Sequence, residues 1–179
     1  MVSEEFEEAF EGLWSAVKAN DSNQVDMCLI VLDREDESAG APSNLFFERV
    51  LEVAEYVSAH GNCARQVFYW IEDRYSSMSD DQKRKIRDFI AANYGRIVEK
   101  TAAFRIAEWV GRFGDEWALN LIEEWIARRA TFRPDNAACI GAALSEFLDG
   151  SYGTPYSELR KRGILISREY HAALKAERP

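Results

Sequence analysis

Three positions suited to beginning a helix recur at an interval of 36 residues in this 179-residue chain. They are Ser43, Ser79 and Asp115, whose short side chains can accept a hydrogen bond from a backbone N–H in the first helical turn. Apolar residues follow each of them at helical spacing, and glycines or short polar runs separate the successive stretches. The interval therefore predicts three similar pairs of antiparallel helices over residues 43–149.

The apolar positions repeat with the same interval. A shift of 36 residues superposes Val50, Ile86 and Ile122, and five further sets of apolar residues follow the same shift. A unit of two antiparallel helices that recurs every 30–50 residues, roughly, is typical of an α-solenoid. Over residues 43–149 the pattern resembles HEAT-like and related helix-hairpin repeats. The resemblance implies a stack of helix pairs, and an irregular helical bundle is the alternative architecture.

The segment before the repeat also has helical spacing. Residues 1–32 are expected to form a variant first helix pair, with Ser3 as the N-cap of its first helix. The second helix of this pair is apolar on nearly every side over residues 25–32, which predicts a central position in the fold. A loop is expected over residues 33–42, where no periodicity remains.

The segment after the repeat departs from the 36-residue pattern. Residues 151–179 are expected to form a C-terminal cap, with a short helix from Tyr156 that stops at Gly163 and a final helix that begins after Ser167. Together these patterns predict one all-α domain over residues 1–179. It is a small α-solenoid of about four antiparallel helix pairs with a C-terminal capping segment.

Acidic residues are concentrated in the first third of the chain. Residues 1–60 carry 14 acidic and 3 basic side chains, whereas residues 61–179 carry 17 and 19. The net charge is −9 and the pI is about 4.9. This asymmetry argues against nucleic-acid and membrane partners and favours a basic protein partner, although some HEAT-like repeats wrap DNA with a basic concave wall. Solubility alone is the other explanation of the charge.

Sequence signatures of catalytic and cofactor sites are absent. The chain has no phosphate-binding glycine loop, dinucleotide fingerprint or nucleophile elbow. Its two histidines, His60 and His171, lack the spacing that helical metal sites use. Adjacent carboxylates such as Glu123 and Glu124 point about 100° apart on a helix and do not converge on one atom. We therefore expect no cofactor, no metal and no enzymatic activity, with an enzyme of unrecognised site as the less favoured alternative.

The tetrapeptide from His60 to Cys63 is the closest match to a nucleophilic site, because a thiol at a helix start near an imidazole can be activated. The helical pattern gives these residues a structural explanation instead. His60 precedes a glycine that ends a helix, Asn62 is the expected N-cap of the next helix, and Cys63 continues a core stripe. With Cys28 and Cys139 also in apolar stretches, we expect three free, buried thiols. Free thiols and a chain start without the basic region of a signal peptide predict a cytoplasmic location.

A protein partner is the expected ligand of this chain. On the first helix Glu4, Glu8 and Glu11 share one face because their spacing is i, i+4 and i+7. Antiparallel packing returns the end of the second helix to the start of the first, which predicts one negative partner-binding patch. Its expected members are Glu4, Glu5, Glu8, Glu11, Asp33, Glu35, Asp36 and Glu37. Trp109 and Trp117, which flank a tight turn, are candidate aromatic hot spots if they are partly exposed.

These properties favour a non-enzymatic protein-binding domain. A compact acidic helical chain without catalytic residues looks like a bacterial immunity-type protein, which implies neutralisation of a toxin by covering a basic active site. The alternative is a scaffold or regulatory adaptor that binds a peptide in the solenoid groove.

Overall fold

The computed structural model of the protein describes residues 4–36, 42–129, 136–150 and 157–177. Every regular element in these ranges is a helix, so the predicted all-α fold class is confirmed. The chain divides into two compact units, residues 1–102 and residues 103–179. Over the described ranges, no helix combines the length and the hydropathy that a bilayer span requires.

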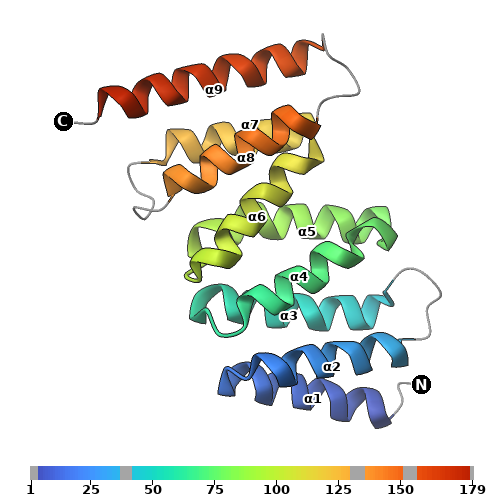
Figure 1. Ribbon diagram of the computed structural model, residues 1–179. Helices are drawn as coiled ribbons and strands as arrows, with labels where there is room; N and C mark the ends of the chain where they lie inside the picture. The colour runs from blue at the N-terminus through green and yellow to red at the C-terminus, as the bar shows by residue number, and fades with distance from the viewer. Residues whose placement is uncertain (1–3, 37–41, 130–135, 151–156, 178–179) are drawn as a thin grey trace. The chain divides into compact units, whose positions relative to one another are not determined.

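The N-terminal unit consists of consecutive helices that run back and forth (Figure 1). Their bounds are α1 Glu4–Ala19, α2 Ser22–Glu35, α3 Asn44–His60, α4 Ala64–Arg74 and α5 Asp80–Asn93, with short 3₁₀ helices η1 Tyr75–Ser77 and η2 Tyr94–Arg96. α1 packs on α2, α2 on α4, and α3 on both α4 and α5. Phe6 of α1 meets Phe46 of α3 edge to face, with ring centroids 5.8 Å apart, and both rings are buried. Each helix of this unit therefore buries one apolar stripe against its neighbours.

The C-terminal unit is also helical. α6, Lys100–Phe113, begins at the boundary between the units and continues into the second one. The helices after it are α7 Glu116–Ala127, α8 Asn136–Gly150 and α9 Glu158–Ala176. α8 contacts both α7 and α9, and α7 contacts α9. Ile122, Leu144 and Phe147, none more than 1% exposed, form the centre of this core.

The three N-caps predicted from the 36-residue interval are confirmed. The side chains of Ser43, Ser79 and Asp115 each accept a hydrogen bond from the backbone N–H three residues on, at 3.2, 3.3 and 3.0 Å. α3, α5 and α7 therefore begin 36 residues apart. A cap of this kind stabilises a helix by about 1 kcal/mol.

The side chain of Gln82 ties the start of α5 to the start of α3. It is 2% exposed, and its Nε2 donates to the carbonyl oxygen of Pro42 at 2.8 Å and to Oδ1 of Asn44 at 3.3 Å. Its Oε1 accepts from the N–H of Ser79 at 3.0 Å, which completes a capping box. A buried amide with three partners fixes how the two helices lie against each other, because any shift leaves a buried polar group unpaired.

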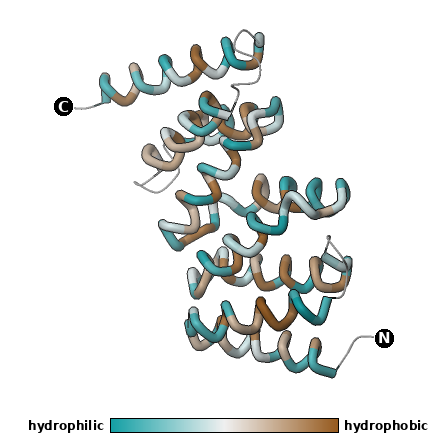
Figure 2. Tube along the Cα trace, turned by 45° about the vertical axis from the view of Figure 1, so that its right-hand side comes forward, coloured by the Kyte–Doolittle hydropathy of each residue, from teal (hydrophilic) through white to brown (hydrophobic). Residues whose placement is uncertain are grey.

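The expected central position of the second helix is wrong. α2 continues to Glu35, past the expected loop start at Asp33, and it leaves Met27 and Ile30 56% and 63% exposed. Figure 2 shows the hydrophobic stretch in the second half of this helix. α2 packs on α1 and α4, which cover one side of it. Because its residues 25–32 are apolar on nearly every side, the apolar residues of the uncovered side are exposed. The predicted N-cap Ser3 lies outside the described residues.

Two other predicted boundaries are wrong. The N-cap position of α4 is Cys63 rather than Asn62; Cys63 has φ 54°, and its N–H donates to Oδ1 of Asn20 at 3.2 Å. In the C-terminal unit, one continuous helix, α9, replaces the two expected helices. Gly163 does not end a helix there but lies buried inside α9, where a Cβ would come within 2.7 Å of the Phe147 ring. This glycine permits close packing of α9 on α8.

Replacing Gly111 by alanine is expected to destabilise the C-terminal unit by about 3 kcal/mol. The added Cβ would lie 2.3 Å from the carbonyl oxygen of Ala143, a backbone atom of α8 that cannot move without separating α6 from α8. The control is Gly141→Ala, also within a helix, because a Cβ there meets no atom within 4 Å. It should gain about 0.5–1 kcal/mol from helix propensity. Urea unfolding followed by circular dichroism measures both, and equal effects would contradict the close approach of α6 and α8.

Candidate functional site

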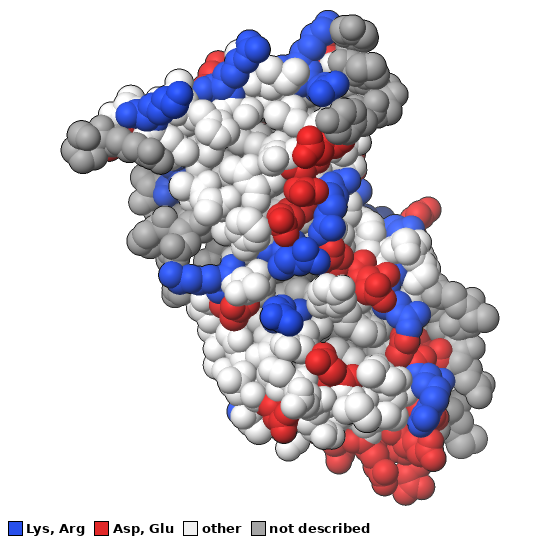
Figure 3. Space-filling view, in the orientation of Figure 1, with Lys and Arg blue, Asp and Glu red and all other residues white. Residues whose placement is uncertain are grey.

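Four glutamates form an acidic surface on α1. Glu4, Glu5, Glu8 and Glu11 are all exposed, and their carboxylates form no ion pair with any residue that the structure describes. Figure 3 shows acidic side chains gathered over this end of the N-terminal unit. Glu4 and Glu5 also lie in the first helical turn, where a carboxylate stabilises the helix dipole. Glu8 and Glu11 lie beyond that turn, so their position is not explained by the dipole.

The predicted patch members at the end of the second helix serve the fold instead. Asp33 forms an ion pair with Arg74 of α4, and both side chains are about two-thirds covered or more. Asp36 accepts a hydrogen bond of 2.6 Å from the backbone N–H of Ser43, at the start of α3. The Glu35 side chain is mostly buried, and its Oε1 lies 3.5 Å from Nε of Arg34, the preceding residue. Glu37 lies outside the described residues. Of the predicted patch, the structure therefore leaves the α1 members as unpaired surface carboxylates.

An open groove of about 440 Å³ is lined by residues of α1 and α2. They are Glu5, Glu8, Ala9 and Gly12 of α1 and Gln24, Met27, Cys28, Val31 and Arg34 of α2. The two helices come close at Gly12, where a Cβ would lie 3.2 Å from the Cys28 thiol. We call this depression the α1–α2 groove.

The α1–α2 groove combines an apolar floor with charged edges. Met27, more than half exposed, supplies a flexible side chain that adapts to different apolar partners. Ile30, on the same exposed side of α2, extends the apolar area beyond the groove. Glu5 and Glu8 border the floor on one edge and Arg34 borders it on the other. Such a surface can receive an apolar side chain and hold a cation next to it.

Reversing the charge of Asp33 and of Glu8 should separate the structural from the free carboxylates. Asp33→Lys breaks the ion pair with Arg74 and sets two cations together in a half-buried position, which is expected to cost about 1–2 kcal/mol of unfolding free energy. Glu8→Lys breaks no ion pair among the described residues and relieves repulsion between glutamates one turn apart, so stability should stay within about 0.5 kcal/mol of wild type. Both are read from chemical unfolding curves. A loss for Glu8→Lys as large as for Asp33→Lys would mean that Glu8 is also structural.

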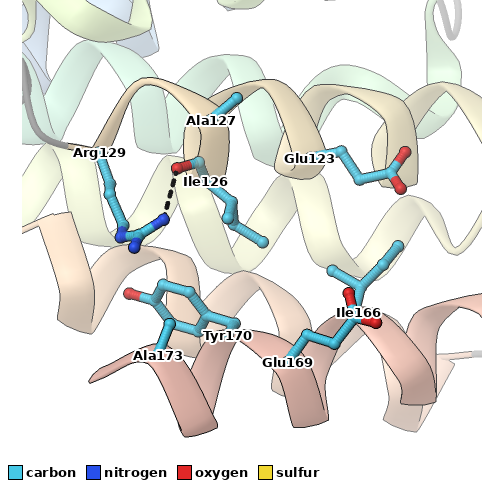
Figure 4. Close-up of a pocket in the computed structure, with 8 residues that line it drawn as sticks. All are labelled: Glu123, Ile126, Ala127, Arg129, Ile166, Glu169, Tyr170 and Ala173. Atoms are coloured by element: carbon cyan, nitrogen blue, oxygen red, sulfur yellow. Dashed lines mark hydrogen bonds between the residues drawn. The ribbon is translucent and has the colours of Figure 1, made fainter. Parts of the chain in front are cut away.

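A second hollow, of about 390 Å³, lies between α7 and α9 in the C-terminal unit (Figure 4). At one end Arg129 donates to the carbonyl oxygen of Ile126 at 3.5 Å and to Oε1 of Glu177 at 2.7 Å. At the other end Glu123 forms an ion pair with Arg162 of α9. These pairs help to position α9 against α7 on either side of the hollow. Sequence reasoning did not find it, because its two walls lie some forty residues apart and share no motif.

Tyr170 lies at the buried side of this hollow and connects α9 to α8. It is 2% exposed, and its hydroxyl donates to the carbonyl oxygen of Ala137 at 3.1 Å. Burial raises the pKa of Tyr170 above its ordinary value, and the nearby positive charge of Arg129 opposes the change. The hydrogen bond to Glu177 raises the pKa of Arg129 itself.

The raised pKa of Tyr170 predicts a loss of stability at alkaline pH. Above about pH 10 an unfolded tyrosine loses its proton whereas the folded one keeps it, so the folded state binds more protons and stability falls as pH rises. Tyr170→Phe should cost about 1 kcal/mol near neutral pH through the lost hydrogen bond, and should reduce the alkaline decline. Tyr69→Phe, at an exposed position, should leave the decline in place. Unfolding curves between about pH 8 and 11 test this, and an unchanged slope in the Tyr170 variant would contradict it.

The two candidate aromatic hot spots occupy different environments. Trp109 is only 6% exposed, so it does not meet the condition of partial exposure on which its candidacy rested. It lies three residues after the buried Ile106 and therefore continues the core stripe of α6. Trp117 is half-buried. Both indoles pack on Phe113, with ring centroids 5.5 Å away in each case, so the cluster stabilises the α6–α7 turn.

The cysteines are free and buried, as predicted. The Cys63 thiol lies 3.6 Å from Oδ1 of Asn20 and 3.9 Å from Oγ of Ser22, and burial raises its pKa, which favours the protonated form. His60 is exposed, and its ring stacks on Tyr56 at 4.0 Å between centroids. A nucleophilic cysteine requires a thiolate next to a base. Cys63 and His60 therefore do not form such a pair. Across the ranges that the structure describes, no cluster of three or more His, Cys, Asp or Glu side chains could hold a metal ion.

No family model, curated protein or solved structure matches the chain. The resemblance to HEAT-like repeats therefore stays a prediction, carried by the 36-residue pattern alone. Function has to be inferred from the surfaces of this chain itself, and the acidic surface of α1 with the α1–α2 groove is the one that is least explained by the fold.

Proposed function

We propose that this protein is a non-enzymatic binding domain that holds a basic protein partner on the acidic surface of α1 and in the adjoining α1–α2 groove. One observation carries the proposal. Glu5 and Glu8, whose carboxylates form no ion pair among the described residues, line an open groove whose apolar residue Met27 is more than half exposed. An apolar centre with a charged border is the usual make-up of a protein interface.

Electrostatics supports a basic rather than a neutral partner. The glutamates of α1 lie one helical turn apart, and each such like-charge pair disfavours the helix by a few tenths of a kcal/mol, roughly. Lysine or arginine side chains of a partner would relieve this repulsion on binding. A concentrated negative field also speeds the encounter with a basic surface, and it selects the partner more than it sets the final affinity.

Within this class, a bacterial immunity-type role agrees best with the charge. Such a protein neutralises a toxin by covering a basic active site with carboxylates, and α1 presents several on one face. The groove favours a second candidate, a scaffold or adaptor that binds a basic peptide, because its apolar floor can receive single side chains from an extended or helical segment. The two roles share the same surface and differ in the partner.

Capture of the partner by the full-length protein tests the proposal. The immobilised wild-type chain is incubated with a lysate of its source organism, beside the variant Glu5→Lys/Glu8→Lys/Glu11→Lys, and retained proteins are identified by mass spectrometry. We expect at least one basic protein to be retained by the wild type and lost from the variant. Its retention should fall by about tenfold when salt is raised to about 0.5 M, because exposed charge pairs are screened.

A matched variant controls for total charge. Glu52→Lys/Asp73→Lys/Asp88→Lys changes the net charge by the same amount at exposed positions of the same unit. It should retain the partner as the wild type does. The proposal fails if the α1 variant retains the same proteins as the wild type, or if both variants lose them equally, since the second result would report net charge rather than a site.

A further inference from the structure

The outer face of α9 carries a basic stripe with an apolar residue in it. Lys161, Leu165, Arg168, Ala172 and Lys175 follow i, i+4, i+7, i+11 and i+14 spacing, and all five are exposed. Leu165 is 56% exposed, on a helix that buries its opposite face against α7 and α8. Figure 3 shows basic side chains along this helix.

Within the ranges that the structure describes, few of the charges of this stripe form ion pairs. Lys161 pairs with Glu158 on its own helix, at 2.6 Å and at exposed positions. Neither Arg168 nor Lys175 forms an ion pair with a residue that the structure describes. An exposed pair such as Lys161–Glu158 contributes little and exchanges readily for another partner.

We propose that α9 of one copy docks in the α1–α2 groove of a second copy. The inference rests on the proposed function, in that it takes the groove to be a protein-binding site, and it names a second copy of this chain as an occupant. Leu165 would enter the apolar floor beside Met27. The flanking cations Lys161 and Arg168 would face the carboxylates of α1.

The spacing of the charges supports this match. Glu4 and Glu11 on α1 are seven residues apart, as are Lys161 and Arg168 on α9. At about 1.5 Å per residue, each pair spans about 10 Å along its helix. Two helices laid side by side can therefore place both cations opposite carboxylates at once, with Leu165 between the two cations.

The same charges determine the symmetry of the contact. The acidic surface of α1 repels another copy of itself, and the basic stripe of α9 does the same, so a two-fold contact through either face is disfavoured. A contact between unlike faces is either made twice within one closed pair, with α9 of each copy in the groove of the other, or it leaves one groove and one α9 free. In the second case assembly continues from copy to copy or closes into a ring. A single helix in a groove buries little area, so the association is weak and needs high protein concentration.

Analytical ultracentrifugation of the full chain tests the proposal. At about 0.02 M salt the average mass should rise with protein concentration, and about 0.5 M salt should weaken association about tenfold. The acidic-surface variant Glu4→Gln/Glu8→Gln/Glu11→Gln and the helix variant Leu165→Ser/Arg168→Gln should each stay monomeric. Mixed together, they should form a one-to-one dimer and nothing larger, because only one intact acidic surface and one intact α9 remain per pair.

A control with matched chemistry is Leu45→Ser/Arg65→Gln, which removes an exposed leucine and an exposed arginine elsewhere. It should assemble as the wild type does. A wild-type chain that is monomeric at all concentrations overturns the inference, as does a mixture of the two variants that fails to form a dimer. Should the wild type stay monomeric while the α1 charge variant still loses its captured partner, the inference fails and the proposed function stands. Should the chain assemble while no basic protein is captured, the groove recognises its own copy alone.

Discussion

A helix with one apolar stripe is stable only when another helix covers that stripe, and this requirement organises the whole molecule. Phe10, Leu13 and Val17 of α1 are at most 5% exposed, and at about 25 cal/mol per Å² of buried apolar area such side chains dominate the stability of the unit. The requirement also explains where the charge lies. α1 begins the first unit and α9 ends the second, and the face of each that lies opposite its buried stripe is free to be polar. Selection for binding can act there without disturbing the core.

Much of the fold could be predicted because its signals are local. The caps Ser43, Ser79 and Asp115 act within one helical turn, so their spacing in the sequence is their spacing in the structure. The errors have a common cause in tertiary contacts. Gly163 has the local appearance of a helix stop, but its lack of a side chain serves the approach of the Phe147 ring from another helix. No pattern within α9 reveals that contact.

In the candidate site, too, local features were predictable and tertiary contacts were not. The face shared by Glu4, Glu8 and Glu11 follows from helix geometry and was predictable. The ion pair of Asp33 was not predictable, because its partner Arg74 lies 41 residues further along the chain. The α1–α2 groove also escaped prediction, since its lining residues come from two helices and no motif within either helix marks it. Surface charge is readable from a sequence, whereas a hollow depends on which elements meet.

The contacts around Pro42 have a consequence for how the gene can be rearranged. The backbone N–H of Ser43 donates a hydrogen bond of 2.6 Å to the Asp36 carboxylate, and the side-chain amide of Gln82 donates to the carbonyl oxygen of Pro42. The two ends of this connection are therefore kept together by native contacts rather than by the length of peptide between them. Lengthening a connection whose ends are already fixed costs only about 0.6 kcal/mol for each doubling. The connection is thus a tolerant point for a reporter domain or for new chain termini made by circular permutation.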